Sequence, residues 1–584
     1  MAKNVMKQLK PSANLGRNAF DLSHRNVFTA NFGELLPCCC IETVPSEDYV
    51  EIKPSDLVRA MPLVTSPFLR AKQHIDFWFV PYQALWSRFN EFMVDKDEPV
   101  SSSLNYRDYI PHTALSNLYI TLNQDYTKKD IVGRSLKQGG YKLLNLLGYG
   151  ASDEWLGDQG NYQVNLFRLA AYNFIWYKEY RQKYFDDGRH LMPSSSLKTT
   201  TAFLWNFDDL PCDDLQNSDP VYVRETGYCE AMLQMRYRCW KKDLFTGLMP
   251  SQQFGDVSQI TSQNVKSVLE YVYNVNDAQP TNRRVLTTYD GKSFISAAAT
   301  DGNIPSTWKQ DEIALKTGVL KSQVDVLSLR KAEAVQKWRE NALRAGNQIE
   351  DNFEAHYGTK PHSHLISHPT YIGSYDSSLN IGDVISTAQT GEGSNQSLGD
   401  IAGKGIMSLD GKTLKFKTTD FGVIMGIFSL LPEAEYNALG VDRMNQLLER
   451  EDFFVPEYEN LGLEPVNTAV FYAGELHGDN AVSLLGFAPR YWGYKQKFDQ
   501  CFGEMMHTSN RTGLFSHWCS PKTDVPAQLL TADGVLPLSC LYVNPALFDI
   551  NFNVSVENSD QFLVDMFNDV TAIRGMSVQG MPSY

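Results

Sequence analysis

HIDFWFVP (His74–Pro81) and FGVIMGIFSL (Phe421–Leu430) are the two segments that indicate the fold class most clearly. Both are short and rich in aromatic and β-branched residues, which favour strands over helices. The second stretch belongs to an apolar run that is too short to cross a bilayer, so it fits a buried strand. Because the two stretches lie toward opposite ends of the chain, we expect a mainly β fold whose sheet pairs residues far apart in sequence.

Two further segments also suggest strands. In KTLKFKT (Lys412–Thr418), Leu414 and Phe416 alternate with lysines. This period of two is typical of a strand with one buried face. FDINFNVSV (Phe548–Val556) likewise predicts a strand near the C-terminus.

Two segments predict helices, Asn165–Phe185 and Leu327–Gly358. The first is rich in good helix formers and aromatic residues. The second carries one apolar stripe at helical spacing, formed by Val335, Trp338, Ala342, Ala345, Ile349 and Phe353. Gly358 and Pro361 then end it. We expect this stripe to pack against a sheet or a neighbour.

The segments Gly255–Val319 and Ser386–Asp400 have the Asn, Asp, Thr, Ser and Gly content of exposed loops. We expect both to be excursions from a scaffold, and long loops of this kind often carry binding surfaces.

The net charge of −15 excludes a surface that binds DNA everywhere, since phosphates attract positive charge. The N-terminus is a local exception, because Met1–Phe20 contains Lys3, Lys7, Lys10 and Arg17 and no acid. This segment is either a flexible basic arm or simply a disordered terminus. No secretory signal precedes it, and we expect a soluble protein made in a cytoplasm.

Motifs for catalysis or for nucleotide and metal binding are absent from the sequence, including GxxxxGK[ST], HExxH, paired CxxC and GxSxG. We therefore expect no catalytic residues and no cofactor. The tract with His356, His362, His364 and His368 leaves zinc conceivable, but a polar linker after a helix is the favoured interpretation. For the pair His517 and Cys519 we favour a structural role.

Three consecutive cysteines, Cys38, Cys39 and Cys40, raise the question of thiol chemistry. In an extended strand adjacent side chains point to opposite faces, so the three thiols cannot ligate one tetrahedral ion. Adjacent cysteines also make strained disulfides. We expect reduced, mostly buried side chains and no metal.

Several phrases, in their order along the chain, resemble the major capsid proteins of the microviruses, which are small tailless icosahedral bacteriophages with single-stranded DNA. The helix phrases near Asn165 and Leu327 belong to this resemblance, and Trp240–Asp256 is its most specific phrase. The other phrases are His24–Ile52, Arg59–Trp86, Phe453–Val466, Phe487–Met505 and Gln561–Met576. The gokushoviruses or related gut phages are the most similar branch.

The resemblance implies an eight-stranded antiparallel jelly roll of the viral capsid type, with long loop and helix insertions. It divides the chain into a basic arm at residues 1–25 and a single capsid domain at residues 26–584. The insertions are residues 165–185, residues 255–319 as a variable surface excursion near the three-fold axis, and residues 327–358.

The same resemblance implies a structural protein rather than an enzyme. It would form a T=1 shell of sixty copies around single-stranded DNA, as a virion component assembled in the host cytoplasm. Implied partners are other copies of the chain, a small basic packaging protein, a pilot or minor virion protein, and a receptor on the bacterial host. Lys3, Lys7, Lys10 and Arg17 are the candidate DNA contacts. Two alternatives stay open, a carbohydrate-binding or carbohydrate-active β-sandwich protein and a zinc hydrolase using the histidine tract.

Overall fold

A computed structural model gives the architecture of the chain. It describes residues 17–45, 48–86, 89, 93, 112–123, 132, 134–150, 162–182, 232–253, 268–272, 284–289, 292–296, 326–345, 354–358, 368–385, 401–418, 420–471, 484–508, 511–512, 518–519 and 541–578. The chain divides into two compact units, residues 1–252 with 346–584, and Gln253–Ala345.

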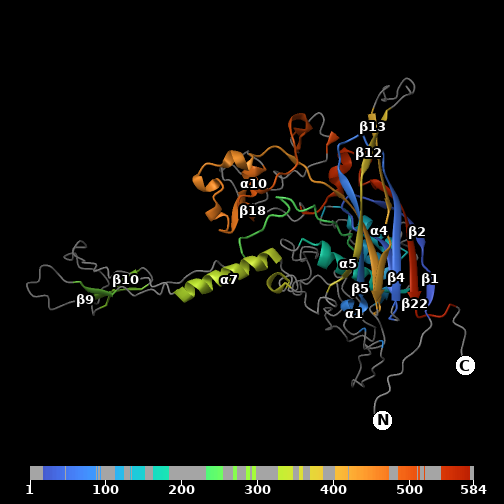
Figure 1. The fold of residues 1–584 in the computed structure, drawn as a ribbon, viewed down its shortest axis with the longest axis horizontal. Coiled ribbons are helices and arrows are strands. Elements are labelled where there is room, and N and C mark those ends of the chain that lie inside the picture. Colours follow the sequence, from blue (N-terminus) through green and yellow to red (C-terminus); the bar gives the residue numbers. More distant parts are fainter. Residues whose placement is uncertain are drawn as a thin grey trace, which may run out of the picture. The chain divides into compact units, whose positions relative to one another are not determined.

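Two antiparallel sheets form the framework of the first unit (Figure 1). The first sheet has the order β1 (Asn18–Asp21), β22 (Phe562–Arg574), β4 (Asp48–Ala60), β13 (Ile401–Asp410) and β12 (Asn380–Ile385), while β2 (His24–Ala30) also pairs with β22 and β14 (Leu414–Thr418) with β4. The second sheet has the order β11 (Thr370–Ser378), β5 (Ala71–Pro81), β15 (Gly422–Pro432) and β3 (Leu36–Thr43).

The pairing of β5 with β15 confirms the long-range contact expected from the two apolar stretches. Val80 lies opposite Val423, and Phe77 lies opposite Gly426. A glycine is required at position 426, because a Cβ there would lie 2.9 Å from Phe77 Cε1 and 3.1 Å from Cys38 Sγ. The centre of the second sheet therefore has no room for another side-chain carbon.

The two sheets share one hydrophobic core. Phe28 of β2 meets Phe428 of β15 edge to face, with ring centroids 5.5 Å apart. Between β2 and β3, Asn26 Nδ2 donates a 2.7 Å hydrogen bond to the Cys38 carbonyl. This bond satisfies a buried backbone acceptor at the sheet–sheet boundary.

The mainly β fold with antiparallel sheets is thus confirmed, and it is consistent with a capsid jelly roll. Seven strands form the first sheet and four the second within the described residues, so the count of eight stays a prediction. Helices α4 (Leu136–Leu146) and α5 (Phe167–Ile175) lie against strands of the second sheet.

The first predicted helix is shorter than residues 165–185. Asn165 ends strand β7 (Gln163–Asn165), and α5 continues as a π-helix, η1 (Trp176–Tyr180). Arg181 then turns to extended backbone, while its N–H still bonds to the Trp176 carbonyl. Its guanidinium lies over the Tyr177 ring, 4.1 Å from the ring centroid.

The unit Gln253–Ala345 contains helix α7 (Val326–Ala345) and a three-stranded sheet of β8 (Val268–Val272), β9 (Arg284–Tyr289) and β10 (Lys292–Ser296). Residues 255–319 thus contain three strands despite their loop-like composition, and their role as a surface excursion stays a prediction. Asp290-Gly291, the sequence between β9 and β10, is a pair typical of tight hairpins. On α7, Ala342 is buried but Trp338 is 59% exposed.

The predicted strand Phe548–Val556 is also wrong. Its first residues lie in a 3-10 helix, η11 (Pro545–Ile550), which Asn544 caps by accepting a hydrogen bond from the Ala546 N–H. Asp549 then accepts 2.9–3.0 Å bonds from Ser555 and from the Val556 N–H. These local side-chain bonds satisfy the backbone that a strand would have paired.

The remaining elements are short: α1 (Tyr82–Leu85), β6 (His112–Ala114), α3 (Leu115–Asn123), β16 (Tyr436–Asn437), η4 (Arg443–Gln446), η5 (Arg450–Asp452), η6 (Pro456–Tyr458), β17 (Leu463–Asn467), η7 (Thr468–Val470), β18 (Leu484–Pro489), α10 (Trp492–Lys495), β19 (Gln500–Cys501), η8 (Gly503–Met505), β20 (His507–Thr508) and β21 (Arg511–Thr512). None of the helices among the described residues is long and apolar enough to span a membrane.

Candidate assembly surface and pocket

A second hydrophobic core brings together three segments that are far apart in the sequence. Its buried members are Leu244, Phe245, Leu248, Tyr436, Val466, Val470, Phe471, Leu485, Ala488 and Trp492. Phe245 is central, with its ring centroid 4.4 Å from that of Tyr436 and 4.8 Å from that of Phe498. We call the segments 433–471 and 484–505, built on this core, the lobe.

In the phrase KDLFTG (Lys242–Gly247), Asp243 forms a turn that places Phe245 in this core. Asp243 Oδ1 accepts hydrogen bonds from the N–H groups of Phe245, at 2.8 Å, and Thr246, at 2.9 Å. Its other oxygen accepts a 2.5 Å bond from the Tyr436 hydroxyl. An aspartate thus fixes both the turn and the contact with the lobe, which is a structural role.

Large apolar side chains are exposed over the lobe. They are Leu448 (87%), Phe453 (52%), Phe454 (49%), Leu461 (66%), Tyr494 (52%) and Phe502 (67%). Single exposed apolar residues are ordinary, but a group of them on one structural element indicates an interaction surface. Phe454 and Tyr494 both contact the ring of Tyr491, so part of this group is continuous.

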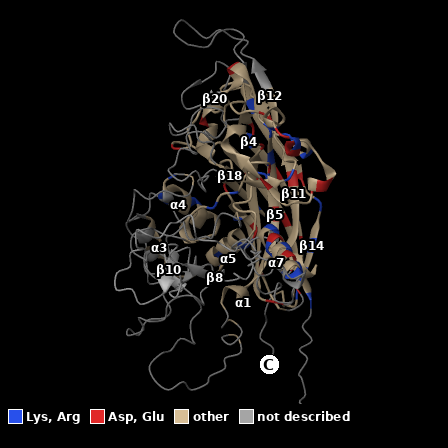
Figure 2. Cartoon of the chain, turned by 90° about the vertical axis from the view of Figure 1, so that its left-hand side faces the viewer, with Lys and Arg blue, Asp and Glu red and all other residues tan. Residues whose placement is uncertain are grey.

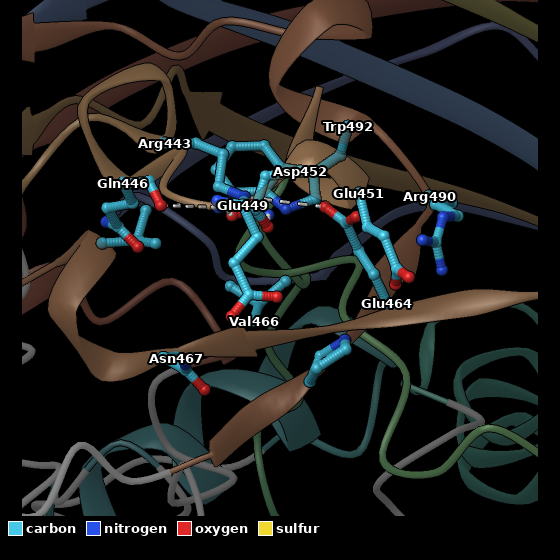
Figure 3. Close-up of a pocket in the computed structure, with 12 residues that line it drawn as sticks. Arg443, Gln446, Glu449, Glu451, Asp452, Glu464, Val466, Asn467, Arg490 and Trp492 are labelled. Atoms are coloured by element: carbon cyan, nitrogen blue, oxygen red, sulfur yellow. Dashed lines mark hydrogen bonds and ion pairs between the residues drawn. The ribbon is translucent and has the colours of Figure 1, made fainter. Parts of the chain in front are cut away.

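The lobe also contains a partly open pocket of about 390 Å³ with charged walls (Figure 3). Arg443 bonds Asp452 at 3.2 Å and lies 3.9 Å from Glu464. Burial raises the pKa of Glu464, although the Tyr491 N–H and the Arg443 charge oppose that rise. The indole Nε1 of Trp492 is buried and has no hydrogen-bond partner.

The pocket is lined by acids, two arginines and apolar side chains. Its lining is Arg443, Gln446, Glu449, Glu451, Asp452, Glu464, Pro465, Val466, Asn467, Val470, Arg490 and Trp492. None of these is a serine, cysteine, histidine or lysine, so the lining holds no hydroxyl or thiol nucleophile paired with a histidine or lysine base. Arg443 pairs with Asp452 and donates a hydrogen bond to the Gln446 carbonyl, and these contacts hold the segment 443–452, which presents Leu448 to solvent.

Of the four predicted DNA contacts, the structure describes Arg17 alone. Lys3, Lys7 and Lys10 lie outside the described residues. Arg17 is exposed and immediately precedes β1. The predicted arm, residues 1–25, is too long, because β1 and β2 pair with β22 and so include most of residues 18–25 in the first sheet.

Acidic and basic residues are interspersed along the strands that face the viewer in Figure 2. On the first sheet, Arg25 pairs with Asp565 at 2.7 Å, and Lys415 pairs with Glu51 at 3.2 Å. Such pairing cancels the local field that would attract a polyanion. Among the described strands these contacts do not make a continuous basic surface.

The cysteine triplet lies in β3, as predicted. Cys38 and Cys39 are each 2% exposed, while Cys40 is partly buried. Burial raises the pKa of all three thiols, that of Cys40 to about 12. The thiols therefore stay protonated at neutral pH and are poor nucleophiles.

The histidine tract is described only at His356 and His368, while His362, His364 and His517 lie outside the described residues. Neither described histidine belongs to a group of three potential ligands. The structure instead gathers Glu435, Cys501 and Cys519, whose ligand atoms all lie within 4.8 Å of one another. No spacing in the sequence indicated this cluster, because its members come from three separate segments.

Comparison with known proteins agrees with this architecture. The profile of a family described as capsid protein (F protein) matches residues 9–124 and 139–584. "Capsid protein VP1" of Chlamydia phage 1 is 22% identical, over 98% of this chain and 96% of the relative. "Capsid protein VP1" of Bdellovibrio phage phiMH2K is 20% identical over the same shares of the two chains.

Proposed function

The chain belongs to the phage capsid protein (F protein) family, and from that premise we propose that sixty copies of it close into a T=1 icosahedral shell around a circular single-stranded DNA genome. It is a structural major capsid protein of microviruses and a component of the virion. The observation that carries this assignment is the family match, which spans nearly the whole chain.

The lobe supplies the surface best suited to contacts between copies. Contact with another copy would bury the exposed apolar side chains of the lobe away from water; these include Leu448, Phe453, Leu461 and Phe502. Stable subunit interfaces commonly bury upward of ~2,000 Å². In a closed shell each contact repeats by symmetry, so contacts of modest strength suffice.

The inner face would contact single-stranded DNA through basic residues of the N-terminal segment. Lys3, Lys7, Lys10 and Arg17 remain the candidates. With a net charge of −15 the chain does not neutralise a genome alone. We therefore include a small basic packaging protein and a pilot or minor virion protein among the partners, with assembly in the host cytoplasm.

Residues 255–319 would form the surface excursion that meets a receptor on the bacterial host, near the three-fold axis. They belong to the compact unit Gln253–Ala345, which has its own three-stranded sheet. A separate unit of this kind can vary in sequence without disturbing the jelly roll.

Electron microscopy of the purified product tests the proposal. Uniform icosahedral particles are expected, and dispersed monomers that bind sugar would favour the β-sandwich alternative. Deleting residues 1–16 leaves β1 intact and tests the DNA role. Particles of the deletion variant should hold less DNA than wild-type particles, and an unchanged content of packaged DNA would exclude the arm as a DNA contact.

A further inference from the structure

Two buried cysteines and one glutamate converge at the base of the lobe. Cys501 and Cys519 are 9% and 7% exposed, and the side chain of Glu435 is 12% exposed. The ligand atoms of the three residues lie within 4.8 Å of one another. We propose that these residues bind one zinc ion, which fastens the segment at Cys519 to the lobe.

The distances fit tetrahedral zinc. With Zn–S near 2.3 Å and Zn–O near 2.0 Å, a sulfur and an oxygen on one tetrahedral ion lie about 3.5 Å apart. Cys501 Sγ and Glu435 Oε2 are 3.4 Å apart. Two thiolate sulfurs on one ion lie about 3.8 Å apart, and Cys501 Sγ and Cys519 Sγ lie within 4.8 Å of one another. The Met505 thioether is 3.7 Å from Cys519 Sγ and lies beside the cluster.

The backbone fixes the position of each ligand before any ion arrives. Glu435 and Cys501 are next to one another because β16 pairs with β19, with Asn437 opposite Cys501. The Cys519 carbonyl accepts a 3.0 Å hydrogen bond from Asn551 Nδ2, and Asn551 is itself 1% exposed. Ligands held in this way lose little freedom on binding.

The donor set selects zinc among the abundant cations. Two thiolates favour zinc and copper(I) over magnesium and calcium, and the carboxylate favours zinc over copper(I). Arg70 lies 3.9 Å from the second oxygen of Glu435, so this oxygen has a charged neighbour that orients the carboxylate. Since each thiol must lose its proton, binding should weaken as the pH falls.

Metal analysis of the intact chain, purified under reducing conditions and dialysed against metal-free buffer with added Zn²⁺, tests the proposal. We expect one zinc per chain. Cys501→Ser and Cys519→Ser should each weaken Zn²⁺ binding at least 100-fold in competition with a chelator. The control Cys40→Ser, at a partly buried thiol in β3, should bind Zn²⁺ like the wild type.

A second measurement uses only the wild-type chain, so it tests the proposal even where the variants do not fold. The wild-type chain loaded with Co²⁺ should show the near-ultraviolet absorption of thiolate-to-metal charge transfer, and Zn²⁺ should abolish it. Folded, reduced protein that binds neither ion would overturn the proposal. So would a Cys501–Cys519 disulfide in the native chain, seen as a mass 2 Da below that of the reduced chain, because the thiols would then be unable to bind the ion.

Discussion

Glu34 is the ionisable group whose removal we expect to damage the fold most. Its carboxylate is fully buried and accepts hydrogen bonds from Arg134, at 2.5 Å, and Lys142, at 2.6 Å. Asn31 donates two more, from its backbone N–H and its side chain. Lys142 also pairs with Asp560, next to β22. The network therefore ties the β2–β3 connection to α4 and to the C-terminal strand.

The magnitude follows from the pKa of Glu34. Burial alone would raise this pKa, but the charges of Lys142 and Arg134 outweigh burial and lower it from 4.5 to about 2. This pKa difference of about 2.5, at about 1.4 kcal/mol for each pKa unit, corresponds to about 3 kcal/mol of folding free energy. Breaking a buried ion pair from one side typically costs a similar 3–5 kcal/mol.

The pH dependence has a definite sign. Because the pKa of Glu34 in the folded state lies below its ordinary value of 4.5, the stabilisation is complete above pH 4.5 and is lost as the pH falls toward 2. Glu34→Gln should therefore lower the free energy of unfolding by about 3 kcal/mol at pH 7. The difference between wild type and variant should shrink steadily below pH 4.5.

Urea unfolding of the unassembled subunit, followed by tryptophan fluorescence, measures this effect. Glu42→Gln is the matched control, since Glu42 also pairs with an arginine, Arg168 at 2.5 Å, but its side chain is 46% exposed. We expect the control to lose under about 1 kcal/mol. If Glu34→Gln lost as little stability as the control, or if the wild-type stability were constant between pH 5 and pH 2.5, the Glu34 ion pairs would not stabilise the fold as proposed.

Three more predictions concern the core and the lobe. Burial raises the pKa of Asp56 from 3.8 to about 7, so its contribution to stability is lost as the pH rises through 7; Asp56→Asn should stabilise the subunit in urea by up to about 4 kcal/mol at pH 8 and hardly at all at pH 4, and equal effects at both pH values would contradict this. Gly426→Ala should cost about 1–3 kcal/mol, whereas Gly382→Ala, in β12 with nothing within 4 Å, should be nearly neutral in the same titration. Leu448→Ser with Phe453→Ser should leave the circular dichroism spectrum unchanged but reduce particle yield in sedimentation, and wild-type yields would exclude the lobe as an assembly surface.

The strands that could be predicted are those whose residue pattern leaves no local alternative. The apolar stretch at Phe421–Leu430 is buried on both faces in β15, and Lys412–Thr418 contains the half-buried strand β14. The segment Phe548–Val556 has similar strand propensity. Its backbone is instead held in a 3-10 helix and a turn by hydrogen bonds to the side chains of Asn544 and Asp549, in place of pairing with another strand. Propensity alone does not rank these alternatives.

The candidate site was less accessible to prediction than the fold. The resemblance identified the phrases around Phe245 and Tyr491 without indicating that Phe245 packs into the core of the lobe. The exposed apolar side chains nearby, such as that of Leu448, which is 87% exposed, follow no distinctive sequence pattern. They indicate an interaction surface only because the structure places several of them on the lobe. The predicted DNA contacts Lys3, Lys7 and Lys10 lie outside the described residues, so they stay predictions.

The mainly β class, the family resemblance and the extended, buried setting of the cysteine triplet could be predicted from the sequence, because they depend on residue type, order and a period of two. Which groups share a site depends on the three-dimensional fold. Glu34 meets Lys142, and Glu435 meets Cys501, across chain separations that no local pattern encodes. Their pKa values and ligand geometry depend on distance and burial, and both arise when the sheets and the lobe close.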